Sequence, residues 1–235
     1  MNEDEIKRPD LAIYSQNEVI AAGGQPTWDS PDITTNDWRP FRLMPEARVK
    51  VRNLSPNAAA ANALVHYYIS RFGIGAPREL KATRRISLAP GAETELLFPL
   101  EQAVLNGDPR VGVFIEIEHR HDTKKINNSG AQVHQGDYTS EVGRNHAISF
   151  PVVNNSSFTR QIALQVLPTN LTASVTPNSF SLAPLQEVTA TLNISVPATI
   201  VGSPGNEINE AVTVIGVLAG GGLLGGLTRL LRIDT

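Results

Sequence analysis

The chain has no cysteine among its 235 residues. This excludes disulfide bonds, thiolate metal sites and a cysteine nucleophile. Charge is also scarce: 18% of the residues are charged, the net charge is −3, and no basic stripe is present. Since binding to nucleic acid depends on clustered positive charge, we expect no nucleic-acid partner.

A secretory signal is missing from the first residues. Residues 1–8 (MNEDEIKR) are acidic and contain no apolar core. The segment is therefore not a signal peptide. As written, the chain is expected to stay in the cytoplasm. Removal of a leader, or non-classical export, would instead place it outside the cell, so the compartment stays open.

Long apolar runs are lacking too. The uncharged apolar stretch at residues 211–227 is interrupted by six glycines. A membrane helix needs about 20 mostly apolar residues, so we expect no membrane span. The alternative to a membrane-inserting GxxxG helix is a hairpin with strands Ala211–Leu218 and Leu224–Ile233. Glycines 220–222 would turn the chain, and the valines of this stretch favour strand.

Common catalytic motifs are absent as well. The chain has no Gly-x-Ser-x-Gly, no His-Glu-x-x-His and no P-loop. The segment Gly73-Ile74-Gly75 lacks the third glycine of a dinucleotide-binding fingerprint. We therefore predict a non-enzymatic protein without a cofactor.

An internal repeat is the strongest positive feature. Ser-Leu-Ala-Pro at residues 87–90 returns at residues 181–184, 181 − 87 = 94 residues later. Each copy leads into an apolar strand that ends in proline, at Pro99 and Pro197. Upstream, residues 49–55 (VKVRNLS) correspond to residues 150–156 (FPVVNNS), an offset of 154 − 53 = 101. A period near a hundred residues is about the length of one immunoglobulin-like sandwich.

Strand-like alternation of apolar and polar residues runs through both copies, and the clearest example is Val188–Val196. No amphipathic helix of three turns is evident. These patterns predict an all-β protein of two tandem immunoglobulin-like antiparallel β-sandwiches, residues 8–140 and 144–235. The polar stretch 136–143 marks the boundary, and residues 20–45 are expected to form a long Pro-rich loop that carries aromatic side chains.

One cluster of residues could bind a metal. It comprises His119, His121, Asp122, His134 and Asp137. If the turn after the strand centres on residues 127 and 128, His121 lies opposite His134. Two imidazoles and a carboxylate could hold zinc or copper. The alternative is that these polar residues simply end a strand as it enters a surface loop.

Glu116 and Glu118 lie on one face of the same expected strand, about 6.5–7 Å apart by strand rise. This spacing overlaps that of an inverting glycosidase pair. A solvated sheet face carries glutamates in the same pattern, and we favour that interpretation.

Aromatic side chains are the better candidates for binding. They are Trp28, Trp38, Phe41, Tyr67 and Tyr68. Aromatic rings near the end of a sandwich can stack on sugars or anchor a protein contact. Alternatively, the two tryptophans close the open end of the first core.

Both halves resemble known bacterial immunoglobulin-like domains. Residues 49–55, and residues 117–122 leading to Asn127-Asn128, are similar to the cell-adhesion-related bacterial domain. Residues 28–33 (WDSPDI) resemble an element that precedes such domains. Residues 150–155 and 182–184, leading to Val196-Pro197, resemble the immunoglobulin-like domain associated with α-galactosidases. The resemblance implies the fold and a non-catalytic role, and it assigns no functional residue.

The expected function is therefore protein interaction or a structural role in a bacterial or phage-type assembly, through a protein partner or self-association. One alternative is a carbohydrate-binding module that uses the loop of Trp28 and Trp38 on a polysaccharide. Another is a metal-dependent enzyme at His119, His121 and His134. Burial of the tryptophans would count against the carbohydrate module.

Overall fold

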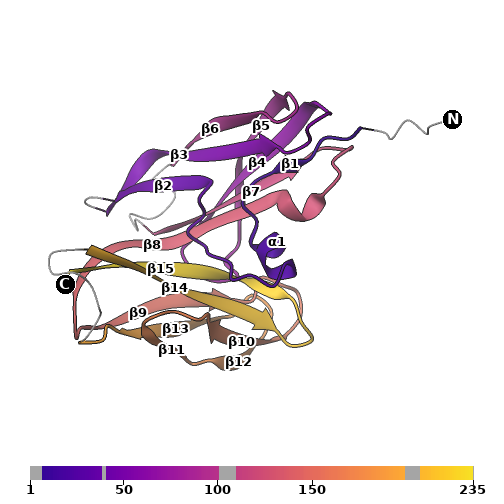
Figure 1. Cartoon of the computed structure of the whole chain (residues 1–235). Coiled ribbons are helices and arrows are strands. Elements are labelled where there is room, and N and C mark those ends of the chain that lie inside the picture. Colours follow the sequence, from indigo (N-terminus) through magenta and orange to yellow (C-terminus); the bar gives the residue numbers. More distant parts are fainter. Residues whose placement is uncertain (1–6, 39–40, 101–109, 199–206, 235) are drawn as a thin grey trace.

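A computed structural model describes residues 7–38, 41–100, 110–198 and 207–234. The chain is almost entirely β-structure (Figure 1). One short helix, α1 (Gln16–Ala21), and a 3-10 turn, η2 (Lys125–Asn127), are its described helices. The first half contributes β1 (Leu11–Ala12), β2 (Ile33–Trp38), β3 (Phe41–Asn53), β4 (Ala60–Arg71), β5 (Glu79–Leu88), β6 (Glu93–Pro99), β7 (Val111–Glu118) and β8 (Ser129–Glu141).

The second half continues this pattern. Its strands are β9 (Asn145–Val153), β10 (Arg160–Val166), β11 (Thr172–Thr176), β12 (Ser179–Leu182), β13 (Glu187–Ser195), β14 (Glu207–Leu218) and β15 (Leu223–Asp234). The all-β fold is thus as predicted. In the first half, β1, β2, β3 and β6 form one sheet, which faces β5, β4, β7 and the start of β8. In the second half, β11, β13 and β9 face β12, β10, β14 and β15.

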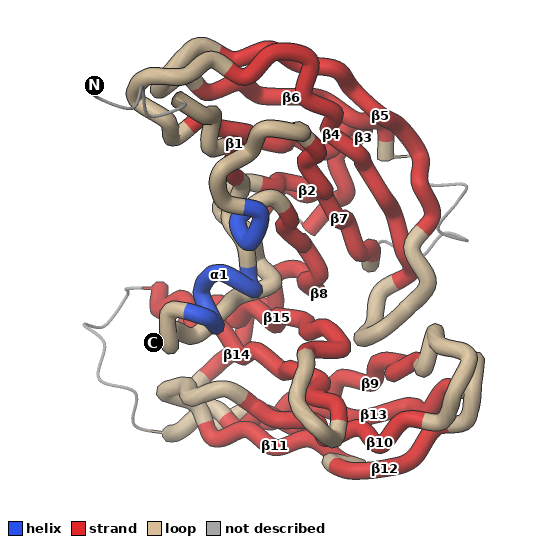
Figure 2. The backbone as a smooth tube through the Cα atoms, turned by 90° about the vertical axis from the view of Figure 1, so that its right-hand side faces the viewer, coloured by secondary structure: helices blue, strands red, loops and turns tan. Residues whose placement is uncertain are grey.

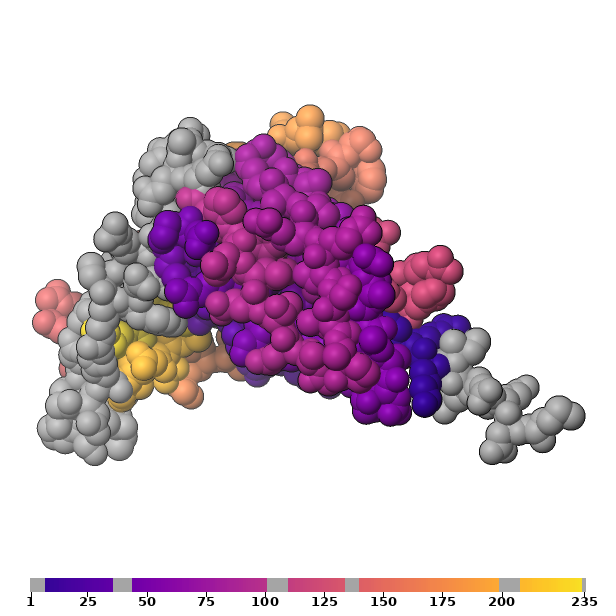
Figure 3. All heavy atoms as spheres, turned by 90° about the horizontal axis from the view of Figure 1, so that it is seen from above, coloured from indigo at the N-terminus to yellow at the C-terminus, as the bar shows by residue number. Residues whose placement is uncertain are grey.

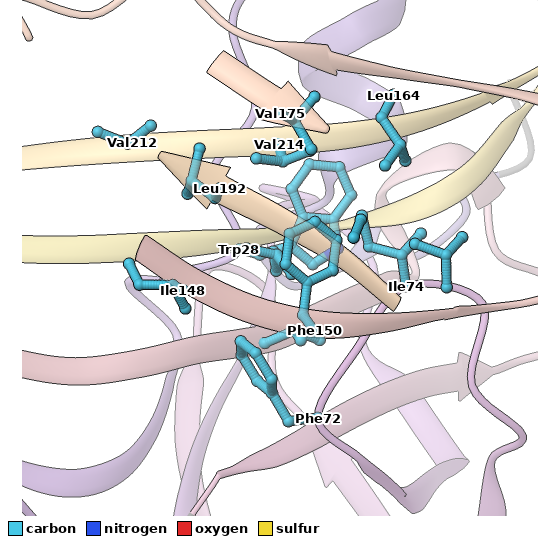
Figure 4. Packing of buried hydrophobic residues seen from close by; sticks show 14 of the residues in the cluster. Trp28, Phe72, Ile74, Ile148, Phe150, Leu164, Val175, Leu192, Val212 and Val214 are labelled. Atoms are coloured by element: carbon cyan, nitrogen blue, oxygen red, sulfur yellow. The ribbon is translucent and has the colours of Figure 1, made fainter. Parts of the chain in front are cut away.

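Each half encloses its own core, because apolar side chains alternate inward along the facing strands. The first core includes Val49, Val65 and the stacked rings of Tyr67 and Phe98, whose centroids are 4.6 Å apart. The second core is built around Phe150 and Leu192 (Figure 4). The chain therefore forms two sandwiches.

The two sandwiches share one sheet, however. Strands β12, β10, β14, β15, β8, β7, β4 and β5 lie side by side in that order. The start of β8 pairs with β7 up to Val133, and from His134 onward β8 runs parallel to β15. The predicted boundary at residues 136–143 thus lies in and just after a strand that serves both sandwiches. Figure 2 shows the two bodies stacked, with β8 and β15 between them.

The first half also completes the second core. In the loop between β4 and β5, Ile74 is fully buried and hydrogen-bonds to β9: its N–H donates to Pro151 O (3.0 Å), and its C=O accepts from Val153 N–H (2.9 Å). Phe72 and Trp28 pack in the same cluster (Figure 4). The segment Gly73-Ile74-Gly75 therefore docks one sandwich onto the other.

The internal repeat has a structural cause. Asn53 donates from Nδ2 to the carbonyl oxygens of Ala58 (2.8 Å) and Ala89 (3.1 Å). Asn154 donates in the same way to Phe158 (2.8 Å) and Ala183 (3.1 Å). In each sandwich, one buried asparagine at a strand end thus ties a loop to the Ser-Leu-Ala-Pro turn. Buried carbonyl groups need such partners, which explains why both motifs recur.

The turn itself is also duplicated. Ala92 N–H donates to Ala89 O, and Gln186 N–H donates to Ala183 O, both at 3.2 Å. The third residue of each turn has positive φ: Gly91 at 67° and Leu185 at 59°. Proline followed by a residue with positive φ is typical of a type II turn.

The C-terminal hairpin prediction is confirmed. β14 and β15 pair antiparallel, and glycines 220–222 turn the chain with positive φ. The prediction of one long loop over residues 20–45 is wrong, because this segment contains β2 and the start of β3, which form a hairpin. None of the helices in the described part of the chain is long and apolar enough to cross a membrane.

Candidate functional site

Trp28 is not a surface binding residue. Its side chain is only 2% exposed, and its ring packs against Gly226 of β15. Its backbone N–H donates to Thr228 Oγ1 (2.8 Å), and its C=O accepts from Val133 N–H (2.8 Å). The expectation that Trp28 binds a ligand is therefore wrong, and its ring seals the junction between the sandwiches.

The other aromatic candidates have different surroundings. Tyr67 is fully buried in the first core, and burial raises the pKa of its hydroxyl. Tyr68 is half-buried on the opposite face of β4. The side chains of Trp38 and Phe41 lie outside the described residues, so their role in binding stays a prediction. Of the expected aromatic set, only Tyr68 is shown on an accessible face.

The three candidate metal ligands are not brought together. Strand β7 pairs with β8 so that Glu116 faces Ser129 and Gly112 faces Val133. His134 follows Val133 on β8 and therefore lies level with the start of β7. His119 and His121 instead follow the end of β7. At about 3.3 Å per residue, these ends are roughly 25 Å apart. The predicted pairing of His121 with His134 is wrong.

The loop that follows β7 explains the error. Asp122 is buried, and its carboxylate accepts hydrogen bonds from Leu11 N–H (3.2 Å) and Lys124 N–H (3.1 Å). The loop therefore turns at Asp122, several residues before the expected point. Asp122 is a structural residue and not a metal ligand.

His119 and His121 do lie near one another, with ring centroids 6.0 Å apart. They line a surface hollow of about 690 Å³ together with Arg8 and Arg120. Nearby Arg120, burial and His119 lower the pKa of His121. Within the described ranges, no group of three His, Asp or Glu side chains is arranged to hold a metal ion.

Glu116 and Glu118 each face a different partner. Glu116 Oε1 lies 3.6 Å from Arg78 Nη1, and Glu118 Oε2 lies 3.5 Å from His66 Nε2. The two glutamate side chains are 47% and 74% exposed, respectively. The two glutamates therefore lie on a solvated sheet face, as favoured from the sequence.

A groove between the sandwiches brings charged, aromatic and apolar side chains together in one place. It is a hollow of about 240 Å³ against the outer face of β7 and the tip of the β14–β15 hairpin. Arg78 lines this hollow, and its guanidinium lies 3.9 Å from the ring centroid of Phe114. Leu223 and Leu224 form the opposite wall. The docked loop at Ile74 holds these walls together.

The side chain of Arg78 is 44% exposed, so its guanidinium is only partly desolvated. This desolvation lowers the pKa of Arg78, while the charge of Glu116 acts in the opposite direction. Burial and Glu116 also raise the pKa of Tyr68, which hydrogen-bonds to Glu116. A partly desolvated guanidinium over an aromatic ring is well suited to bind a planar anion such as a carboxylate.

A second hollow of about 370 Å³ extends the groove along the second sandwich. It shares Arg78, Leu223 and Leu224 with the first, and its far side carries Asn155 and Arg160. Figure 3 looks down on the first sandwich from above and shows that face closely filled by side chains.

The sequence did not indicate this groove. Arg78 follows a Gly- and Pro-containing loop and belongs to no recognisable motif. Its role depends on the docking of that loop against β9, which no local pattern predicts. The one available signal was Gly73-Ile74-Gly75, whose glycines permit the close approach: a Cβ on Gly73 would lie 2.6 Å from Pro151 O.

Comparison with known proteins adds little beyond the fold. No protein-family model matches the chain, and no curated protein matches it either. Among solved structures, an activated α-2-macroglobulin from Escherichia coli is 10% identical, with a TM-score of 0.31. The similarity covers 99% of this chain and 22% of the macroglobulin chain.

Two smaller proteins are similar over part of the chain. SSP-19, an MSP-domain protein like family member in Caenorhabditis elegans, is 8% identical with a TM-score of 0.28, covering 41% of this chain and 94% of its own. The E. coli chaperone DraB is 17% identical with a TM-score of 0.25, covering 40% of this chain and 57% of its own. These similarities are too weak to support an argument about function.

Proposed function

We propose that this chain is a non-enzymatic, immunoglobulin-like interaction module in a bacterial or phage-type assembly. One observation carries the proposal: the loop around Ile74 and the strand β8 fix the two sandwiches together around a groove. A fixed pair of sandwiches binds another protein without the loss of interdomain freedom that a flexible pair would suffer.

The surroundings of the candidate catalytic residues support this assignment. His134 belongs at the other end of β7 from His119 and His121. Glu116 lies against Arg78, and Glu118 against His66. The groove instead combines an arginine with aromatic side chains, which are residue types enriched at protein contact sites.

The test is chemical cross-linking of the purified full-length chain in extract from its native organism, followed by affinity purification and quantitative mass spectrometry. We expect one protein, or a second copy of the chain, recovered in a fixed molar ratio. Recovery of no stoichiometric protein, together with retention on polysaccharide, would overturn the proposal. Metal analysis of the same preparation tests the metal-dependent alternative.

A further inference from the structure

The unit of buried asparagine and turn occurs in both sandwiches, but two of its residues differ between the copies. In the first sandwich, the loop carbonyl bound by the asparagine belongs to Ala58, and the positive-φ turn residue is Gly91. In the second sandwich, the same positions hold Phe158 and Leu185. The first copy shows that small residues at these two positions are sufficient to form the turn and its hydrogen bonds.

The two larger residues are unfavourable for folding. Phe158 is 59% exposed and Leu185 is 75% exposed, whereas Ala58 is 8% exposed. Leu185 also holds a φ of 59°, a left-handed conformation that is unfavourable for an L-residue with a side chain. Exposed apolar side chains contribute little burial in the free chain, and exposed apolar patches and strained turns are typical of contact sites.

Phe158 and Leu185 flank the same residue. Asn154 Nδ2 donates to Phe158 O (2.8 Å), and Leu185 N–H donates to Asn154 O (2.9 Å). Asn154 in turn lines the 370 Å³ hollow that extends the groove between the sandwiches. The apolar pair thus adjoins the groove.

The charge next to this pair is positive. Arg160 lies over the ring of Phe158, 4.7 Å from the centroid, and donates from Nε to Ser156 Oγ (3.0 Å). β10 pairs with β14 so that Ile162 faces Leu218, which places Arg160 beside the β14–β15 hairpin. The lining of the hollow includes Arg160 and Arg78 and no carboxylate, and Glu116, which lies 3.6 Å from Arg78, is outside this lining.

We propose that Phe158, Leu185, Arg160 and Arg78 form a docking surface for an acidic, apolar segment of a partner protein. An apolar side chain of that segment packs against Phe158 and Leu185, and its carboxylate pairs with Arg160 and Arg78. This proposal rests on the interaction function proposed above. A polysaccharide fits less well, because Arg160 already covers one face of the Phe158 ring.

The experiment uses two synthetic probes and the full-length chain. The first probe is an acetylated, amidated Gly/Ser octapeptide with the core Asp-Leu-Asp-Phe, and the second is its twin with lysine in place of both aspartates. Binding is measured by isothermal titration and by amide chemical-shift changes in NMR. We expect the acidic peptide to bind about tenfold more tightly than its twin, with shifts concentrated at Asn155, Ser156 and Leu224.

Two variants locate the contact, and two matched variants serve as controls. Leu185→Gly and Arg160→Gln should each weaken the acidic peptide about fivefold or more. Leu54→Ala removes an exposed leucine beside Asn53 in the first copy, and Arg85→Gln removes an exposed arginine from β5. Both controls should bind like the unmodified chain. Since Leu185→Gly relieves a strained turn, loss of fold would not explain its weaker binding.

Equal affinity for the two peptides, or unchanged affinity in Leu185→Gly and Arg160→Gln, would overturn the proposal. A chain that self-associates, loses this association in Leu185→Gly and binds neither peptide would also overturn the proposal. The occupant of the surface would then be a second copy of the chain. If the cross-linked complex survives both variants, the docking surface is wrong while the interaction function stands. If the unmodified chain forms no complex, the interaction function itself fails.

Discussion

Leu185 is a single leucine in a turn position that suits glycine. Its counterpart in the first sandwich is Gly91, and both residues have positive φ. We predict that Leu185→Gly raises the free energy of unfolding by about 0.5–1 kcal/mol, since relief of the left-handed strain exceeds the added entropy of glycine in the unfolded chain. Urea denaturation followed by circular dichroism measures the change.

The reverse exchange is the control. Gly91→Leu should lower the free energy of unfolding, because a Cβ at Gly91 meets nothing within 4 Å and the backbone strain alone remains. A Leu185→Gly variant that is less stable than the unmodified chain would show that Leu185 makes a stabilising contact.

His146 gives the fold a pH dependence. Burial, Arg229 and Arg144 lower the pKa of its imidazole, and its Nε2 lies 2.7 Å from Ser140 Oγ. Because the unfolded chain binds the proton more tightly, stability is fully present above the ordinary pKa of about 6.5 and falls as the pH drops below it. Thermal unfolding between pH 5 and 8 should show this loss, and His146→Gln should reduce its slope. An unchanged slope in the variant would contradict the assignment.

At the scale of single residues, the sequence pointed to the right positions more often than to the right roles. The repeat identified Asn53 and Asn154, but the carbonyl groups that they bind come from distant turns. The sequence allows Trp28 to be either a binding residue or a side chain that closes a core, and the packing of its ring against Gly226 decides between these roles. Roles of this kind depend on tertiary contacts, which a local pattern does not contain.

The loop between β4 and β5 is the element that joins the two halves. A Cβ on Gly75 would collide with the carbonyl oxygen of Val153, and its φ is 71°. We predict that Gly75→Ala lowers the free energy of unfolding by about 2–4 kcal/mol, because the loop can no longer dock against β9. Hydrogen exchange should show lost protection at the amides of Ile74 and Val153.

Gly91→Ala is the matched control for this prediction. Gly91 has a similar φ of 67° but open space around it, so alanine there should cost only about 1 kcal/mol. The difference between the two variants measures the docking contact. Equal losses would mean that the loop contributes backbone strain alone and no contact between the sandwiches.

Among the elements, the turns with glycine were predicted and the turns fixed by side chains were not. Glycines 220–222 allow positive φ, and the hairpin of β14 and β15 followed from them. The loop after β7 instead depends on hydrogen bonds from Leu11 and Lys124 to Asp122. One of these partners is more than a hundred residues away, so the sequence placed the turn too late and the β7–β8 register was wrong.

At the scale of the whole molecule, the period of the repeat predicted two sandwiches but not their union. The second core needs Trp28, Phe72 and Ile74 from the first half, and β8 pairs with both β7 and β15. Duplication shows in the sequence because each copy keeps its own strands and turns. The contacts between the two sandwiches are not visible in the repeat, because they are made by residues that differ between the copies.

This union predicts how the halves behave when they are separated. A fragment of residues 144–235 lacks β8 and the side chains of Trp28, Phe72, Ile74 and Phe114 that pack into its core, so we expect no cooperative urea transition and no near-ultraviolet circular dichroism signal. A fragment of residues 128–235 regains β8 but not Trp28, Phe72 or Ile74, and should unfold at a lower urea concentration than the full chain. In the full chain, tryptophan fluorescence and far-ultraviolet circular dichroism should report one common midpoint. A fragment of residues 144–235 with a sharp transition at that midpoint would show that the second sandwich is complete without the first.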